Sequence, residues 1–225
     1  IVDRDQAAGS LLVETMAGDS LSCELVVADL DEPGSCSRAV AEAAEKAGTI
    51  YGLVNNAGIN DGVGLRNGSP EDFMHSLRRN LLHYFEMTQG ALPYLKESKG
   101  AVVNVSSKVA LAGQGGSSGY AAAKGGILSL TREWAIDLLD DGVRVNAVLP
   151  GDVMTPLYRQ WLDTFPDPEE KLASIVSSIP LEKRMSLVEE IASMTVFLLS
   201  PRAGHITGQH LVLDGGYVHL DRVIT

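Results

Sequence analysis

Short apolar runs alternate with helical patterns along almost the whole chain. Predicted strands lie at 25–28, 50–54, 101–105, 143–148 and 211–213, and predicted helices at 8–17, 33–47, 69–95, 120–139 and 186–199. The strand at 50–54 is expected to be buried. Alternation of this kind is typical of a parallel sheet with helices on both faces. Right-handed crossovers make the expected fold a single, doubly wound α/β domain over residues 1–225.

One strand and the helix after it carry side chains suited to acid-base chemistry. The strand at 101–105 stops at two serines, and the next helix contains Tyr120 and Lys124. At 3.6 residues per turn, a spacing of four places the phenol and the ammonium on one face. Ser107 lies at the carboxyl end of its strand, where open α/β sheets bind their ligands. The three groups together predict proton transfer to or from an alcohol or carbonyl oxygen.

The lysine explains how a tyrosine could act as a base near neutral pH. An unperturbed tyrosine has a pKa near 10. A cation about 4 Å away would favour the phenolate by up to about 4 kcal/mol at a surface-like dielectric. The Tyr120/Lys124 pair alone is weak evidence, since an ordinary surface helix can carry both residues. Its position after a strand and a Ser-Ser stop gives it weight.

The segment 155–180 interrupts the alternation of strands and helices. It holds four prolines among leucines and the aromatic residues Tyr158, Trp161 and Phe165. Such an insertion suits a small helical lid over a substrate, whereas each aromatic residue taken singly could equally belong to an extra helix packed on the core. Ser186 and Glu189 then predict a capping box for the helix that ends at 199.

Composition narrows the class of partner. A net charge of −11 argues against nucleic acid and against anionic membrane surfaces. No apolar run approaches the roughly 18 residues of a membrane span. Cys23 and Cys36 are too few for a disulfide framework and favour a reducing cytoplasm. The five histidines show no metal-ligand spacing. We therefore expect a cytoplasmic protein with a small-molecule partner and no metal.

Five features in a fixed order and spacing resemble the short-chain dehydrogenase/reductase family. They are the stretch Asn55-Asn56-Ala57-Gly58, Asn80, Ser107 thirteen residues before the Tyr120/Lys124 pair, Arg144 with Asn146, and Pro150-Gly151. More narrowly, the stretches 106–114, 153–158 and 214–222 look like bacterial L-fucose dehydrogenase-type members of this family. Taken singly, Arg144 and Asn146 are more often structural residues in such a place.

The resemblance implies a Rossmann-type domain and NAD(P)-linked oxidation of an alcohol or reduction of a carbonyl. Tyr120 would be the acid and base, and Lys124 would lower its pKa and bind the nicotinamide ribose. Ser107 would orient the substrate oxygen. Asn80 would bend its helix locally and hold a water that relays the proton toward Lys124. Without the family, Asn80 could simply face solvent.

The resemblance also implies a set of residues that bind the cofactor. They are Asp29 and Leu30 at the adenine, Asn56, Ala57 and Gly58 at the adenosine ribose, and Pro150, Val153 and Thr155 beside the nicotinamide. Asn56 could instead satisfy a turn, and Gly58 could supply only a positive φ. Lys108 and Gln114 lie near the presumed substrate pocket, but a solvated loop is the favoured interpretation of both.

Asp3 and Arg4 bear on the choice of cofactor. Asp3 ends what looks like a strand that begins before Ile1, where a carboxylate can accept hydrogen bonds from ribose hydroxyls. It would repel a 2′-phosphate, whereas Arg4 could pair with one. We weigh the fixed carboxylate above the mobile guanidinium and expect NAD, with NADP as the alternative. The family's first strand and glycine-rich phosphate loop are expected upstream of Ile1.

Two other functions remain open from the sequence. A sugar-nucleotide epimerase or dehydratase would share the tyrosine-lysine chemistry, but 225 residues leave little room for its large substrate domain. A catalytically silent cofactor-binding relative would not require Asn80, Ser107, Tyr120 and Lys124 to be intact. A homotetramer is expected, because apolar residues on two long helices exceed what one core face needs. Those residues are Leu81, Leu82, Tyr84, Phe85, Leu128 and Trp134.

Overall fold

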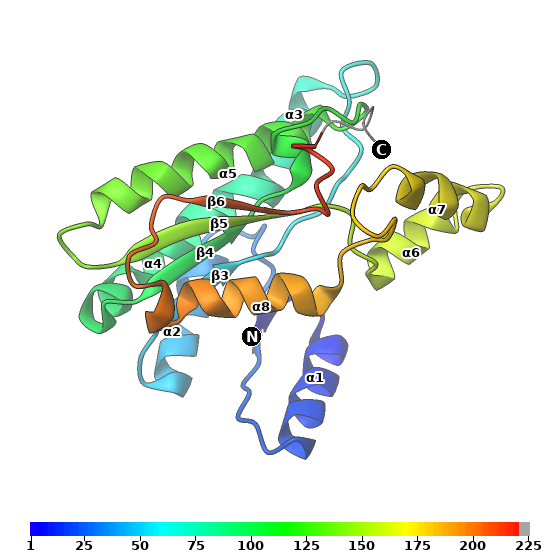
Figure 1. Cartoon of the computed structure of the whole chain (residues 1–225). Helices are drawn as coiled ribbons and strands as arrows, with labels where there is room; N and C mark the ends of the chain where they lie inside the picture. The colour runs from blue at the N-terminus through cyan, green and yellow to red at the C-terminus, as the bar shows by residue number, and fades with distance from the viewer. Residues whose placement is uncertain (221–225) are drawn as a thin grey trace.

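The structure is a computed structural model that describes residues 1–220 (Figure 1). Its main sheet has the order β3-β4-β5-β6, and every pairing is parallel. The strands are β3 Gly52–Asn55, β4 Ala101–Val105, β5 Arg144–Pro150 and β6 His210–Leu213. A separate parallel pair is formed by β1 Val2–Asp3 and β2 Val26–Val27. The predicted doubly wound α/β fold is confirmed, but its strands lie in two sheets.

Helices cover both faces of the main sheet (Figure 1). One face carries α4 (His83–Ser98) and α5 (Ser118–Asp137), and the opposite face carries α8 (Val188–Leu199). The first half of the chain adds α1 (Gln6–Gly18) and α2 (Ser35–Ala47). Short 3-10 turns lie at Lys108–Ala110 (η2) and Pro201–Ala203 (η3).

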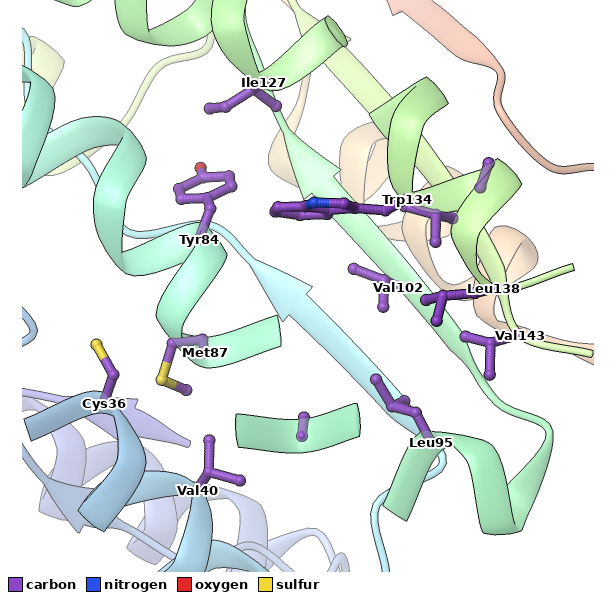
Figure 2. Packing of buried hydrophobic residues seen from close by; sticks show 13 residues of the cluster. Cys36, Val40, Tyr84, Met87, Leu95, Val102, Ile127, Trp134, Leu138 and Val143 are labelled. Carbon is purple, nitrogen blue, oxygen red and sulfur yellow. The ribbon is translucent and has the colours of Figure 1, made fainter. Parts of the chain in front are cut away.

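The larger core lies between the main sheet and the helices α2, α4 and α5. Figure 2 shows Cys36 and Val40 of α2 beside Met87 of α4, and Trp134 of α5 above Val102 of β4. This packing attaches α2 and the β1–β2 pair to the main sheet through side chains. The carboxyl ends of β2 and β3 are thereby brought to one edge of the molecule.

Strand β3 differs from the expected buried strand at 50–54. It begins only at Gly52, and Val54 is 40% exposed. The reason is its position, since within residues 1–220 it pairs with β4 alone and its other edge has no partner strand. A strand with one neighbour leaves much of its surface uncovered.

The predicted helix at 69–95 begins as expected and is interrupted midway. The Ser69 hydroxyl accepts from the backbone of Asp72 at 3.0 Å, and the Asp72 carboxylate accepts from the Ser69 backbone at 3.1 Å. Helix α3 (Pro70–Leu77) then passes into a π turn at Arg78–Leu82 before α4 starts. Asn80 lies in this π turn, so its helix is irregular at the position where a local bend was expected.

The capping box expected from Ser186 and Glu189 is wrong. Helix α8 starts at Val188, and Glu190 accepts a hydrogen bond from the backbone of Leu187 at 2.7 Å. The Ser186 hydroxyl instead donates to the carbonyl of Leu213 at 3.2 Å. The shift arises because Ser186 is held in a bridge with Val153, which delays the start of the helix.

Three of the six apolar residues expected at subunit contacts are buried in the core of this chain. Tyr84 is fully buried, and Leu128 and Trp134 are also buried. Phe85 is 44% exposed, with its ring centroid 6.5 Å from that of Trp134. Fewer apolar side chains of these two helices are therefore available for subunit contacts than the sequence suggests.

The segment 155–180 is helical, as predicted, and forms two short helices. They are α6 (Pro156–Leu162) and α7 (Pro168–Ser177), which lie beyond the carboxyl end of β5 (Figure 1). The Thr155 hydroxyl caps α6 by accepting from the backbone of Tyr158 at 3.1 Å. Within residues 1–220, no helix is both long enough and apolar enough to cross a membrane.

Candidate active site

Ser107 and Tyr120 meet at the carboxyl edge of the main sheet. Ser107 follows β4, and Tyr120 lies in the first turn of α5. Burial raises the pKa of Tyr120, and a hydrogen bond with the Ser107 side chain opposes that rise. The spacing of thirteen residues therefore does bring the hydroxyl and the phenol into contact.

Lys124 is buried beside Tyr120, with only 2% of its surface exposed. Its ammonium donates to the phenol oxygen of Tyr84 at 3.0 Å and to the carbonyl of Val105 at 2.7 Å. The same nitrogen lies 5.5 Å from the centroid of the Tyr120 ring. Burial lowers the pKa of Lys124 to about 7.

The expected lowering of the Tyr120 pKa by Lys124 is not what this structure shows. The pKa of Tyr120 is raised, with burial as the main cause. The physical reason is that the ammonium of Lys124 is directed at Tyr84 and Val105, and its own burial favours the neutral amine. A neutral amine would provide little Coulombic stabilisation of a phenolate.

Tyr84 is a site residue that the sequence interpretation missed, because it was assigned to a subunit contact. It donates to the carbonyl of Val105 at 2.8 Å and accepts from Lys124. Burial raises its pKa well above the ordinary range, so the phenol stays protonated. Its position four residues after Asn80 was the only signal in the sequence that could have placed it here.

Asn80 and Gly58 pack against each other next to Lys124. The side-chain oxygen of Asn80 accepts from the backbone of Ile59 at 2.7 Å, and its amide donates to the carbonyl of Ser76 at 3.0 Å. A Cβ on Gly58 would lie 2.9 Å from that oxygen and 3.5 Å from the Lys124 nitrogen. Two alternatives are therefore wrong: Asn80 is fully buried, and Gly58 has no positive φ.

A cavity of about 310 Å³ collects the residues expected at the adenosine half of a dinucleotide. Seven of the predicted residues line it: Asp3, Arg4, Asp29, Leu30, Asn56, Ala57 and Gly58. Asp31, Ile59, Arg79 and His83 also line it and were not predicted. The cavity reaches Gly58, whose other side touches Asn80, so it adjoins the Lys124 region.

The charged groups of this cavity are partly paired already. The Arg4 guanidinium lies 3.6 Å from the Asp29 carboxylate, with both side chains more than a third exposed. The Asp3 carboxylate accepts from the backbone of Asp5 at 2.9 Å. Burial lowers the pKa of His83, which leaves its ring neutral near pH 7. The lining thus offers carboxylate acceptors and two guanidinium groups, of which that of Arg4 is already paired with Asp29.

The residues expected beside the nicotinamide lie outside this cavity. Pro150 ends β5 and is paired with Leu213, and Val153 forms a bridge with Ser186. Thr155 caps α6. They follow β5, whose neighbour β4 leads into Ser107, so they stand at the same edge of the sheet as the catalytic candidates.

Two residues of the shared pattern serve the scaffold. Arg144 donates to the carbonyls of Leu198, Leu199 and Ser200 at the end of α8, at 2.6, 3.2 and 3.2 Å. Asn146 donates to the carbonyl of Ile206 at 2.8 Å. In the described part of the chain, no three His, Cys, Asp or Glu side chains are grouped as a metal site would require.

Comparison with known proteins places this geometry among oxidoreductases. A family model described as enoyl-(acyl carrier protein) reductase matches residues 1–218. A 3-oxoacyl-[acyl-carrier-protein] reductase of Thermotoga maritima is 38% identical over 80% of this chain and 70% of its own length. An L-fucose dehydrogenase of Bos taurus is 33% identical over 96% and 78%. The crystal structure of Cj0485 dehydrogenase, at 44% identity, covers 99% of this chain and 85% of its own, with a TM-score of 0.92.

Proposed function

Because the chain belongs to the short-chain dehydrogenase/reductase family, whose members are NAD(P)-dependent oxidoreductases, we propose that it transfers hydride between a secondary alcohol and a nicotinamide cofactor. The observation that supports this most is the contact of Ser107 with Tyr120 beside the buried Lys124. The cavity at Gly58 has the carboxylate acceptors that ribose hydroxyls need, so its residues fit the adenosine half of the cofactor.

The chain's own residues handle the proton. A bound nicotinamide supplies the hydride acceptor for alcohol oxidation. Ser107 holds the substrate oxygen. Tyr120, after releasing its own phenol proton, takes the proton of the alcohol as the carbinol becomes a carbonyl. Lys124, with a pKa of about 7, can receive and release a proton close to neutral pH. Asn80 supports this arrangement by fixing the backbone at Ile59, next to Gly58.

The substrate we propose is a secondary alcohol, with a sugar such as L-fucose as the leading candidate. The Bos taurus relative carries that activity in its name, whereas the Thermotoga maritima relative acts on an acyl-carrier-bound substrate. Absorbance of NADH or NADPH over a panel of alcohols, sugars and 3-oxoacyl compounds would identify the class. An epimerase would consume substrate without net reduction of cofactor. A silent relative would bind cofactor and turn over nothing.

We expect NAD to be preferred over NADP, so that kcat/KM with NAD⁺ exceeds the value with NADP⁺. Asp3 would face a 2′-phosphate as a like charge, and Arg4 is already shared with Asp29. Asp3→Ala should relax the preference. Glu14→Ala, which removes an exposed carboxylate from α1, should leave the cofactor preference unchanged. A preference of about tenfold for NADP⁺ in the unaltered protein would overturn this expectation.

We also propose a homotetramer with isologous contacts, as in the family, through the outer faces of α4 and α5. Two exposed apolar side chains on these faces support the proposal: Phe85 on α4 is 44% exposed, and Ile136 on α5 is 69% exposed. Light scattering at micromolar concentration should give the mass of four chains, and Phe85→Asp should reduce it. Leu65→Asp, at a 91% exposed position outside both helices, is the control. A monomeric mass for the unaltered chain rejects the tetramer.

A further inference from the structure

Lys108, the residue directly after Ser107, forms a sheltered ion pair with Asp152. Only 12% of each side chain is exposed. Lys108 was expected in a solvated loop, and the structure corrects that expectation, because Asp152 draws the ammonium inward from the loop after β5. Removing two charges from water costs free energy that their mutual attraction often only offsets. Stabilisation of the fold is therefore not a sufficient explanation for this pair.

Two aromatic residues complete the surroundings of this pair. The phenol of Tyr158, from α6, donates to the Asp152 carboxylate at 3.1 Å. The Lys108 nitrogen lies 4.2 Å from the centroid of the Tyr217 ring. Burial and the nearby Asp152 raise the pKa of Tyr158, so its hydroxyl remains a donor. Side chains from four separate segments thus surround one charged pair, and its lysine directly follows Ser107 in the chain.

The pair has hydrogen-bonding capacity left over. An ammonium carries three protons, and among residues 1–220 Lys108 has Asp152 as its one hydrogen-bond acceptor. A carboxylate has about four acceptor positions, and Asp152 receives one donor from Lys108 and one from Tyr158. The arrangement therefore offers a donor and an acceptor side by side.

We propose that Lys108 and Asp152 bind neighbouring hydroxyls of a polyhydroxylated substrate while Ser107 and Tyr120 hold the hydroxyl that is oxidised. One hydroxyl accepts from Lys108, and the adjacent hydroxyl donates to Asp152. This assignment rests on the proposed function and specifies its substrate class. Lys108 and Asp152 are specificity-determining residues in it, outside the proton transfer.

The charges of the pair discriminate among substrate classes. An apolar alcohol or an acyl chain would cover the pair without satisfying its remaining donors and acceptors, which is unfavourable. A substrate anion would meet the Asp152 carboxylate as a like charge and find Lys108 already neutralised. A ring with vicinal hydroxyls satisfies both partners at once, since each hydroxyl donates and accepts.

The test compares binding and turnover in two variants, Lys108→Met and Asp152→Asn. Isothermal titration of the cofactor-saturated protein with L-fucose, D-glucose and D-arabinose gives affinities that need no turnover. Oxidation of cyclohexanol, a secondary alcohol with one hydroxyl, reports on Ser107 and Tyr120 alone. Each variant should weaken binding of the preferred sugar by about tenfold to a hundredfold and change cyclohexanol kcat/KM by less than about threefold.

The matched control is Lys96→Met, which removes a lysine from another ion pair. Lys96 lies 2.9 Å from Asp141 at the amino edge of the sheet, and its side chain is 48% exposed. It should leave sugar binding unchanged. Melting temperature and cofactor affinity of each variant show whether the fold is kept.

Three results would overturn the assignment. They are no binding of any of the three sugars to the unaltered protein, unchanged sugar affinity in both variants, or an equal loss for sugar and cyclohexanol. The last would mean that the pair only holds α6 in place. Sugar binding that depends on Lys108 and Asp152, without any reduction of cofactor, would support this assignment and reject the proposed hydride transfer.

Discussion

Tyr120→Phe is expected to lower kcat by about 10²–10⁴-fold while cofactor affinity stays within about twofold. The change removes one hydroxyl and keeps the ring. Tyr120 contacts Ser107 through that hydroxyl and presents its ring to Lys124, so the packing should persist. Stopped-flow or steady-state formation of NADH, together with cofactor titration by fluorescence, measures both quantities.

The matched control for this variant is Tyr51→Phe. Tyr51 is 41% exposed at the amino end of β3, away from Ser107, so the same chemical change should be silent there. Retention of more than about a tenth of the rate by Tyr120→Phe would mean that the phenol is not the proton carrier.

Lys124→Met is expected to reduce both turnover and cofactor binding and yet to make the protein more stable. Within residues 1–220 no carboxylate pairs with this buried ammonium, and burial lowers its pKa to about 7, far below the ordinary value near 10.4. Such a shift corresponds to a destabilisation on the order of 5 kcal/mol below about pH 7, where the folded lysine is protonated as well as the unfolded one. Methionine fills the space of the side chain without that cost.

The sign of the pH dependence follows from the lowered pKa. Between about pH 7 and pH 10 the unfolded lysine holds a proton that the folded one has lost, so native stability rises with pH across this window. The gain in melting temperature from Lys124→Met should therefore be larger at pH 7 than at pH 10. The groups that face the ammonium, Tyr84, His83 and Tyr120, remain in the variant.

Thermal unfolding of both proteins at the two pH values decides the matter, with Lys96→Met as an exposed-lysine control. An equal or lower melting temperature for Lys124→Met at pH 7 would show that the buried ammonium is not a source of instability. Full activity in the variant would remove Lys124 from the proposed mechanism.

Local sequence signals predicted several contacts that the structure contains. The cap at Ser69 depends on residues three apart, and the contact of Ser107 with Tyr120 depends on one strand, one loop and one helix. The residues of the cofactor cavity come from the ends of successive strands, which a parallel sheet must bring to one edge. Such features follow from chain order and need no knowledge of packing.

Features that depend on which side chains meet across the core were not accessible in this way. Tyr84 looked like a surplus apolar residue, and only tertiary packing directs its hydroxyl to Val105 and Lys124. Lys108 was expected to be solvated, because the sequence does not show that the loop after β5 places Asp152 beside it. The exposure of Val54 likewise depends on which strands flank β3, which periodicity alone does not specify.

The π turn at Arg78–Leu82 sets the angular phase between α3 and α4. In an α-helix each residue advances the side-chain direction by about 100° around the axis. If the π turn were replaced by regular helix with one residue fewer, α4 would be rotated by about that angle relative to α3. Asn80 then could not face Gly58 while Tyr84 faces Lys124. Regular helical hydrogen bonding through this stretch is therefore incompatible with the observed placement of Asn80 against Gly58 and of Tyr84 against Lys124, and the helix contains the irregular turn instead.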